Sequence, residues 1–215
     1  MLISASLLFG AGFYIVPLFF SLPEDLEADA PRGLLFVDRE GEPVRRFLDG
    51  EFRAEDPATF DELPENLINA TIAVEDSRFF SHPGVDFIGL GRAIRDGLMN
   101  RSFGSGASTI TQQTIKLYSP ARPRNIHTKL IEIFTARKLE MFADKETILA
   151  AYVNKLPYGN QYTGARAAAQ GYFGKPMGDL SVSEAAMLAG LPNKPTRFNP
   201  WRNFESAKKR QIWVL

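Results

Sequence analysis

Hydrophobic and polar positions divide the chain into an apolar start and a long helical remainder. The first 23 residues carry no charged side chain, and residues 2–22 are long enough to form an apolar helix of roughly 30 Å, the thickness of a bilayer's hydrocarbon core. This pattern predicts a transmembrane anchor over residues 1–22. The alternative is a cleaved signal peptide, because Ala28-Asp-Ala30 resembles a cleavage site, although the apolar stretch is longer than a signal peptide needs.

The charges that flank this stretch indicate its orientation. No Lys or Arg precedes it, four acidic residues follow it between positions 24 and 29, and the first cation is Arg32. Because cytoplasmic flanks are typically rich in Lys and Arg, an acidic flank is typical of the translocated side. We therefore expect the remainder of the chain to lie outside the cytoplasm.

Residues 23–62 form a linker rich in proline, glycine and charge. Within it, Leu34–Val37 and Val44–Phe47 flank a turn sequence at residues 38–41, a pattern that predicts a small hairpin next to the membrane. From residue 63 onward the pattern is helical. Capping residues and apolar stripes predict helices over about 64–80, 109–118, 126–142, 145–156 and 182–190, with a Gly/Ser loop at 102–108.

The fold class is therefore mainly α, with residues 63–215 as one domain. The last residues, from Ile212 to Leu215, lie inside what looks like another amphipathic helix, so we expect the domain to be truncated at its C-terminal end.

Composition excludes several functions. The 25 cations balance the 25 anions, so no global basic field favours duplex nucleic acid as a partner. The absence of cysteine excludes a disulfide framework, a thiolate zinc site and a cysteine nucleophile. The two histidines, His82 and His127, lack the spacing of metal ligands, so no metal site is predicted.

Glu75 is the first candidate for chemistry. On a helical wheel of residues 64–80 it falls among apolar positions that include Leu67, Ile72 and Phe79. Desolvation of this kind raises the pKa of a carboxyl group toward the range useful to a general base or acid. A buried glutamate paired with a cation is the other interpretation, and the pattern leaves both open. Asp76 falls at the edge of the arc, as a partner or a helix-end group.

A second group of polar residues follows the Gly/Ser loop. Thr109, Gln113 and Lys116 share one face of their predicted helix, opposite an apolar face. Lys116, Arg122, Arg124 and Lys129 place four cations within 14 positions, a cluster that suits a diphosphate or a lipid headgroup. A solvated surface stripe would give the same pattern. Glu132 falls opposite the apolar side of its helix, which predicts a solvated position.

Five motifs then resemble those of family 51 glycosyltransferases, the peptidoglycan glycosyltransferase domains of class A penicillin-binding proteins and monofunctional transglycosylases. They cover roughly residues 64–215, in order. The motifs are Glu75-Asp-Ser-Arg-Phe-Phe-Ser-His82-Pro-Gly84, Gly106-Ala-Ser-Thr-Ile-Thr-Gln-Gln113, Thr128-Lys-Leu-Ile-Glu132, Ile148-Leu-Ala-Ala-Tyr-Val-Asn154, and Glu184-Ala-Ala-Met-Leu-Ala-Gly-Leu-Pro192. Two positions depart from the family pattern: Thr128 replaces an arginine, for which Arg137 is a candidate substitute, and Leu117 replaces an asparagine.

The resemblance implies a lysozyme-like fold with a membrane-proximal jaw region. It implies polymerisation of lipid II into β-1,4-linked glycan with release of undecaprenyl diphosphate, Glu75 acting as general base in an inverting displacement and Glu132 as the second catalytic glutamate. Lys116 and Arg124 would neutralise the leaving diphosphate. Further substrate contacts are expected from Asp76, Phe79, His82, Ser108, Thr109, Gln112, Gln113, Lys129 and Asn154.

The resemblance also implies the setting. We expect a single-pass protein of the bacterial inner membrane, with its catalytic domain on the periplasmic side and with lipid II, the nascent glycan, membrane lipid and cell-wall synthesis proteins as partners. A divalent cation, Mg²⁺ or Mn²⁺, is compatible with such a site, although no dedicated ligand set is predicted. The alternatives are an inactive membrane-tethered scaffold and, less favoured, a lytic transglycosylase or muramidase.

Overall fold

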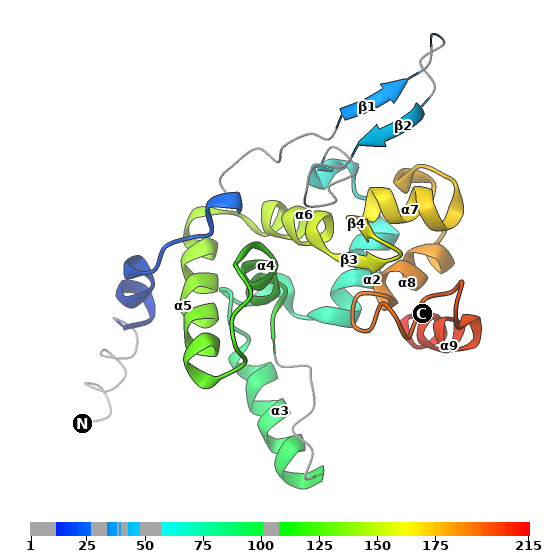
Figure 1. Ribbon diagram of the computed structural model, residues 1–215. Helices are drawn as coiled ribbons and strands as arrows, with labels where there is room; N and C mark the ends of the chain where they lie inside the picture. Colours follow the sequence, from blue (N-terminus) through cyan, green and yellow to red (C-terminus); the bar gives the residue numbers. More distant parts are fainter. Residues whose placement is uncertain (1–11, 27–33, 38, 40–42, 48–56, 101–107) are drawn as a thin grey trace, which may run out of the picture. The chain divides into compact units, whose positions relative to one another are not determined.

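The computed structural model describes residues 12–26, 34–37, 39, 43–47, 57–100 and 108–215 (Figure 1). The chain forms two compact units: residues 1–27 with 75–152, and residues 28–74 with 153–215. It passes from one unit to the other between residues 27 and 28 and again within two helices, α2 (Glu65–Glu75) and α6 (Lys145–Lys155). The architecture is mainly helical, which fits the lysozyme-like domain that the family resemblance implies.

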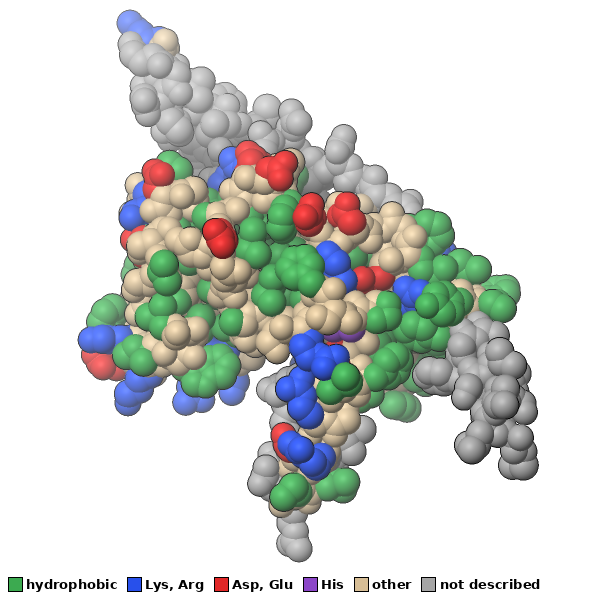
Figure 2. All heavy atoms as spheres, turned by 180° about the vertical axis from the view of Figure 1, so that it is seen from behind, with side chains coloured by type: hydrophobic (Ala, Val, Ile, Leu, Met, Phe, Trp, Pro, Cys, Tyr) green, Lys and Arg blue, Asp and Glu red, His purple; other side chains and the backbone are tan. Residues whose placement is uncertain are grey.

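The first unit is built around packed helices. Its 3-10 helices are η1 (Val16–Phe19), η2 (Glu24–Leu26) and η4 (Phe79–Ser81), and its helices, besides most of α6, are α3 (Phe87–Asn100), α4 (Ile110–Tyr118) and α5 (Ile126–Phe142). Helix α5 packs against both α4 and η1. Helix α3 carries two exposed cations, Arg92 and Arg95, and Figure 2 shows basic side chains on the surface of this part of the molecule.

The second unit holds the strands. Strands β1 (Leu34–Val37) and β2 (Pro43–Phe47) pair antiparallel, with Leu34 opposite Phe47, which confirms the predicted hairpin; turn residues 38 and 40–42 lie outside the described residues. Strands β3 (Pro157–Gly159) and β4 (Tyr162–Thr163) form a second hairpin that the sequence analysis missed. The helical elements, besides most of α2, are η3 (Phe60–Glu62), α7 (Ala165–Phe173), η5 (Met177–Asp179), α8 (Val182–Gly190) and α9 (Phe204–Val214).

The predicted anchor is only partly described. Residues 12–15 are helical and continue into η1, and the helical conformation ends at Phe19, because the backbone of Phe20 is extended. Within the described ranges no helix is both long and apolar enough to cross a bilayer. Residues 1–11 of the expected anchor lie outside the described residues.

Helix starts were predicted well where a capping side chain marks them. Thr109 caps α4, Asn125 caps α5, and Asp144 accepts a hydrogen bond from the N–H of Thr147 at the start of α6. Ser181 and Glu184 form a capping box at the start of α8, which ends at Gly190 as expected. These ends were predictable because the capping signal lies within a few residues of the helix it starts.

The first predicted helix is shorter than expected. The sequence pattern suggested a helix to about Phe80, but α2 ends at Glu75, and Phe79 lies in the separate turn η4. The carboxylate of Asp76 is bonded to groups on other elements, and the N–H of Phe79 donates to the carbonyl of Asp76 in a turn. A helical wheel therefore cannot be extended past Glu75.

Gly84 lies where the loop after η4 meets α5. Its φ of +89° belongs to the left-handed region, and a Cβ there would lie 3.0 Å from the carbonyl oxygen of Ala136. Both the backbone conformation and the close approach require glycine.

We expect Gly84→Ala to lower the free energy of unfolding by about 1–3 kcal/mol, because the side chain adds both strain and a clash with backbone. Gly91→Ala is the control: Gly91 lies in α3 with nothing within 4 Å of its Cβ position, so alanine should stabilise by up to about 1 kcal/mol. Chemical denaturation measures both values. Equal effects of the two substitutions would contradict this reading of Gly84.

Candidate functional site

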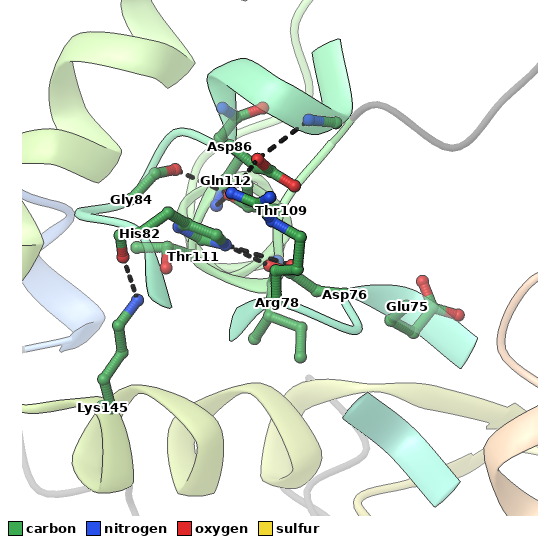
Figure 3. A network of polar contacts seen from close by, with 12 residues as sticks. Glu75, Asp76, Arg78, His82, Gly84, Asp86, Thr109, Thr111, Gln112 and Lys145 are labelled. Carbon is green, nitrogen blue, oxygen red and sulfur yellow. Dashed lines mark hydrogen bonds and ion pairs between the residues drawn. The ribbon is translucent and has the colours of Figure 1, made fainter. Parts of the chain in front are cut away.

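The site is organised by Asp76, the residue after the end of α2. Its carboxylate is buried, with Oδ2 2.9 Å from Nε2 of His82. The same oxygen accepts a hydrogen bond of 3.0 Å from the N–H of Ile110, in the first turn of α4. First-turn N–H groups have no partner within their own helix, and a carboxylate is favoured at a helix N-terminus. Asp76 therefore joins the end of α2, the loop with His82 and the start of α4 (Figure 3).

Thr109 makes a second connection between the same segments. Its hydroxyl donates a hydrogen bond of 2.7 Å to the carbonyl of Gly84 and accepts one from the N–H of Gln112 as the N-cap of α4. Thr109 is buried, as are Asp76, Phe79, His82 and Gln112. All five were expected to contact substrate, which stays a prediction; Asp76 and Thr109 are the two whose side chains bond one motif to the other.

Glu75 faces away from the buried pair of Asp76 and His82. Figure 3 shows its carboxylate turned away from that of the adjacent Asp76. The side chain is partly exposed, and Oε2 accepts a hydrogen bond of 2.9 Å from Nε2 of Gln113 on α4. Tyr152 in turn donates to Oε1 of Gln113 at 3.3 Å. The expectation of a Glu75 enclosed by apolar side chains was wrong in degree, because α2 ends at this residue.

Lys129 on α5 contacts three further residues that were predicted to belong to the site. Its ammonium donates to Oγ of Ser108 and to Oε1 of Gln112, both at 2.8 Å, and lies 3.3 Å from Oε2 of Glu132. The Glu132 side chain is only 19% exposed. The prediction of a solvated Glu132 was therefore wrong, because α5 is covered on one side by α4 and on another by η1.

The predicted diphosphate-binding cations remain open to solvent. Lys116, in the last turn of α4, and Arg124, in the loop before α5, are exposed. Lys116 is three positions after Gln113, so the two lie on the same face of α4, where Gln113 contacts Glu75.

Arg137, the candidate substitute for the missing motif arginine, contacts the N-terminal segment of the chain. Its side chain is buried, and its guanidinium lies 4.9 Å from the ring centre of Phe13 and 4.7 Å from that of Tyr14. Thr128, the residue at the motif position, lies in the first turn of α5, where its N–H donates to the side chain of Asn125. Arg137 thus fastens the N-terminal segment to α5.

Asn154 is the one predicted site residue that belongs to the second unit among the residues described. Its side-chain amide exchanges two hydrogen bonds with the backbone of Ala58, at 2.8 and 3.0 Å. Both functional ends of the amide are engaged, so the side chain holds residues 57–59 in place.

Three residues that the sequence analysis missed, Lys145, Glu140 and Thr111, form a group of contacts beside the segment that contains Phe79 and His82. The ammonium of Lys145 donates to the carbonyl of His82 at 2.7 Å and to Glu140 at 2.6 Å, and lies over the ring of Phe79. Glu140 also accepts a hydrogen bond from the hydroxyl of Thr111. Lys145 is the first residue of the predicted 145–156 helix, and nothing in the local sequence signals its contact with a loop 63 positions earlier.

The structure thus brings together most of the predicted site residues in the first unit. Two neighbouring glutamines on α4 connect them: Gln113 binds Glu75, and Gln112 binds Lys129, which contacts Glu132. The described residues contain no cluster of three or more His, Cys, Asp or Glu side chains that could hold a metal ion. The arrangement offers one accessible carboxylate, a second carboxylate paired with a lysine, and two exposed cations, Lys116 and Arg124.

Comparison with known proteins shows the family to which the chain belongs. A family model described as Transglycosylase matches residues 40–215, and the chain belongs to this family, as the five motifs indicated. Penicillin-binding protein 1A of Pseudomonas aeruginosa is 38% identical over 211 residues, covering 96% of this chain and 25% of the relative. Penicillin-binding protein 1A of Escherichia coli is 37% identical over 220 residues, covering 100% of this chain and 25% of the relative.

This chain spans about a quarter of the length of these relatives. The crystal structure of penicillin-binding protein 1A from Haemophilus influenzae is similar over 87% of this chain and 18% of its own, with 21% identity and a TM-score of 0.44.

Removal of the Asp76 charge tests the framework. We expect Asp76→Asn to lower the free energy of unfolding by roughly 2–4 kcal/mol, because a buried pair loses its charge and the start of α4 loses its anionic cap. Asp96→Asn is the control, since Asp96 pairs with Arg95 on the exposed surface of α3, and it should cost less than about 1 kcal/mol. Similar losses from both substitutions would contradict the central position of Asp76.

Proposed function

We propose that this chain is a peptidoglycan glycosyltransferase that polymerises lipid II into β-1,4-linked glycan strands and releases undecaprenyl diphosphate. Membership of the transglycosylase family supports the class of reaction. The observation that carries the assignment of roles is the contact between Glu75 and Gln113, because it sets a partly exposed carboxylate beside the helix face that ends in Lys116.

Glu75 is the general base in this proposal. It removes the proton from the 4-hydroxyl of the acceptor's N-acetylglucosamine as that oxygen forms a bond to the anomeric carbon of the lipid-linked strand. The bond between the anomeric carbon and the diphosphate oxygen breaks on the opposite face, so the configuration inverts. Gln113 fixes the orientation of the carboxylate through its amide, and Tyr152 fixes that amide in turn.

The leaving diphosphate departs without a proton if its charge is neutralised. Lys116 and Arg124 are exposed cations without an ion pair in the described part of the chain, so they are free to bind it. Lys129, by contrast, is engaged by Ser108, Gln112 and Glu132, and we assign it to positioning these residues. Glu132 assists at the diphosphate, directly or through a divalent cation such as Mg²⁺ or Mn²⁺ that the diphosphate itself would bring.

We further propose that the chain works at the outer face of the bacterial inner membrane, tethered by residues 1–22. A lipid-linked substrate is confined to the bilayer, so a tether raises its concentration at the site. Exposed apolar side chains in the first unit support contact with membrane lipid: Phe19 is 83% exposed, and Leu98 and Met99 on α3 are 68% and 76% exposed beside the cations Arg92 and Arg95.

Loss of the base tests the reaction. Glu75→Gln should reduce lipid II polymerisation roughly 10²–10⁴-fold, because the amide cannot accept the hydroxyl proton. Glu146→Gln, a change of the same kind at an exposed position on α6, should leave the rate unchanged. The assay uses purified protein in detergent with Mg²⁺, with polymer length followed on gels.

Polymer formation by the Glu75→Gln protein at the parent rate would contradict the role of Glu75. Absence of polymer from a well-folded parent protein would instead favour the scaffold alternative, and Thr128→Arg would then show whether the missing motif arginine is the reason.

Lys116→Met tests the diphosphate site separately. We expect kcat/KM to fall roughly 10²–10³-fold, because one cation that stabilises the leaving group is removed. The free energy of unfolding should hardly change, since Lys116 is exposed. Lys209→Met, at an exposed position on α9, is the control for loss of a surface charge and should retain the parent value. An equal effect of both substitutions on kcat/KM would contradict the proposed role of Lys116 at the diphosphate.

A further inference from the structure

The second unit presents an exposed tryptophan on an aromatic base. The indole of Trp201 is 62% exposed. Its ring centre lies 5.3 Å from that of Tyr172 and 6.2 Å from that of Tyr162, both at steep interplanar angles. Such edge-to-face contacts are favourable for aromatic pairs. A large apolar side chain is therefore held in solvent rather than folded into the core.

The backbone that carries this indole is held by a chain of hydrogen bonds. The backbone N–H of Trp201 donates to the side chain of Asn199, which is buried and donates in turn to Asn160 at 2.7 Å. The hydroxyl of Tyr172 donates to the carbonyl of Tyr158 at 2.9 Å. Burial, with a smaller effect of the neighbouring Tyr162, raises the pKa of Tyr172 to about 12, so this phenol keeps its proton at physiological pH.

The aromatic group formed by Trp201, Tyr172 and Tyr162 packs closely against the backbone. A Cβ on Gly171 would lie 2.2 Å from the ring of Tyr162, so the phenol ring packs directly on the backbone of α7. Asn160 and Gln161, at the tip of the β3–β4 hairpin, both have positive φ, at 50° and 66°. Side chains held in strained backbone conformations are frequently found at binding sites.

We propose that Trp201 and the hairpin tip form a binding subsite for β-1,4-linked N-acetylhexosamine glycan, separate from the residues around Glu75. The ligand class rests on the proposed function. The apolar C–H face of a pyranose ring would stack on the indole, and hydroxyl and acetamido groups would bond to the exposed amide of Gln161 and to Arg202 and Asn203 beside the indole. Such a subsite would hold polymer that has already formed, or a strand that awaits extension.

The surroundings of Trp201 favour a sugar over a protein partner. Arg202, Asn203 and Gln161 are exposed and polar, and the exposed large apolar side chain nearest to Trp201 in the sequence is Phe204. A stable protein interface needs roughly 800 Å² on each partner with an apolar centre. A single aromatic ring among hydrogen-bonding groups matches the size and mixed polarity of one or two sugar residues instead.

The second tryptophan of the chain provides a matched comparison. Trp213 on α9 is 64% exposed, close to the 62% of Trp201. The guanidinium of Arg210 lies 4.2 Å from the ring centre of Trp213 and covers one of its faces. No cation among the described residues stacks in this way on Trp201. Trp201 and Trp213 are equally exposed, but only Trp213 has a face covered by Arg210. A sugar that stacks on an open indole face should therefore affect Trp201 alone, whereas a general effect on exposed indoles should affect both.

Two single-tryptophan variants test the proposal. Because the chain contains two tryptophans, Trp213→Phe leaves Trp201 as the sole fluorescent indole, and Trp201→Phe leaves Trp213. Each full-length variant is titrated in detergent with chitotetraose, a soluble β-1,4-linked tetramer of N-acetylglucosamine, and with maltotetraose as the control sugar. We expect a saturable change of emission only for the variant that retains Trp201, and only with chitotetraose.

Calorimetry supplies a second readout. Trp201→Ala should weaken chitotetraose binding at least about tenfold, whereas Trp213→Ala should leave it unchanged. Thermal unfolding of both variants checks that the fold persists. Equal responses of the two indoles, or no response to chitotetraose at either one, would overturn the proposal.

This test is independent of catalysis. Repeating the titration in a Glu75→Gln background measures glycan binding in a protein that is not expected to polymerise. Binding at Trp201 without any polymerisation by the parent would retain the subsite and overturn the proposed reaction. Polymerisation without a Trp201 response would retain the reaction and overturn the subsite.

Discussion

The arrangement of the first unit depends on one buried carboxylate. Asp76 accepts a hydrogen bond from the first turn of α4 and pairs with His82, so a single side chain fixes three segments. A buried ionised group is costly unless it is paired and hydrogen-bonded, and here the available partners satisfy that requirement. Because Glu75 precedes Asp76 directly, the position of the proposed base follows from the position of its buried neighbour.

Helix α4, whose first turn is held by Asp76, positions the other residues of the site. Its N-cap Thr109 is buried, as are Thr111, Gln112 and Thr114 within the helix, which is an unusually polar set for the centre of a helical unit. Each of these four makes a specific hydrogen bond, to Gly84, Glu140, Lys129 and Ile110 respectively. Fully satisfied polar networks hold their members in one arrangement. Because α4 is held in this way, Gln113 can orient Glu75 at the end of α2 and Gln112 can orient Lys129 on α5.

Local signals made much of the fold predictable. The caps at Thr109, Asn125, Asp144 and Ser181 define helix starts within a few residues, and the alternation around residues 34–47 defines the hairpin. These features depend on neighbours in the chain, so the sequence alone contains them. The β3–β4 hairpin was missed because its strands are very short and its turn uses Asn160 and Gln161 at positive φ without a glycine in the turn itself.

The candidate site was predictable in membership but not in geometry. The motifs gathered Glu75, Gln113, Lys129 and Glu132, and the structure places them around α4. Burial was predicted poorly: Glu75 is more exposed and Glu132 less exposed than helical wheels indicated, because a wheel assumes one packed face and a continuous helix. The contacts of Asp76 with His82, of Lys145 with the loop at His82, and of Arg137 with Phe13 arise from tertiary packing, which no local pattern contains.

The most direct test of this account is amide hydrogen exchange at the start of α4. The N–H of Ile110 belongs to a first turn, where such groups usually lack a partner, yet it donates to the buried Asp76. We predict exchange of the Ile110 amide far slower than that of Ile126, the first residue of α5, whose side chain is 76% exposed. Fast exchange at Ile110, equal to that at Ile126, would show that Asp76 does not hold α4 and would contradict the framework on which the proposed site depends.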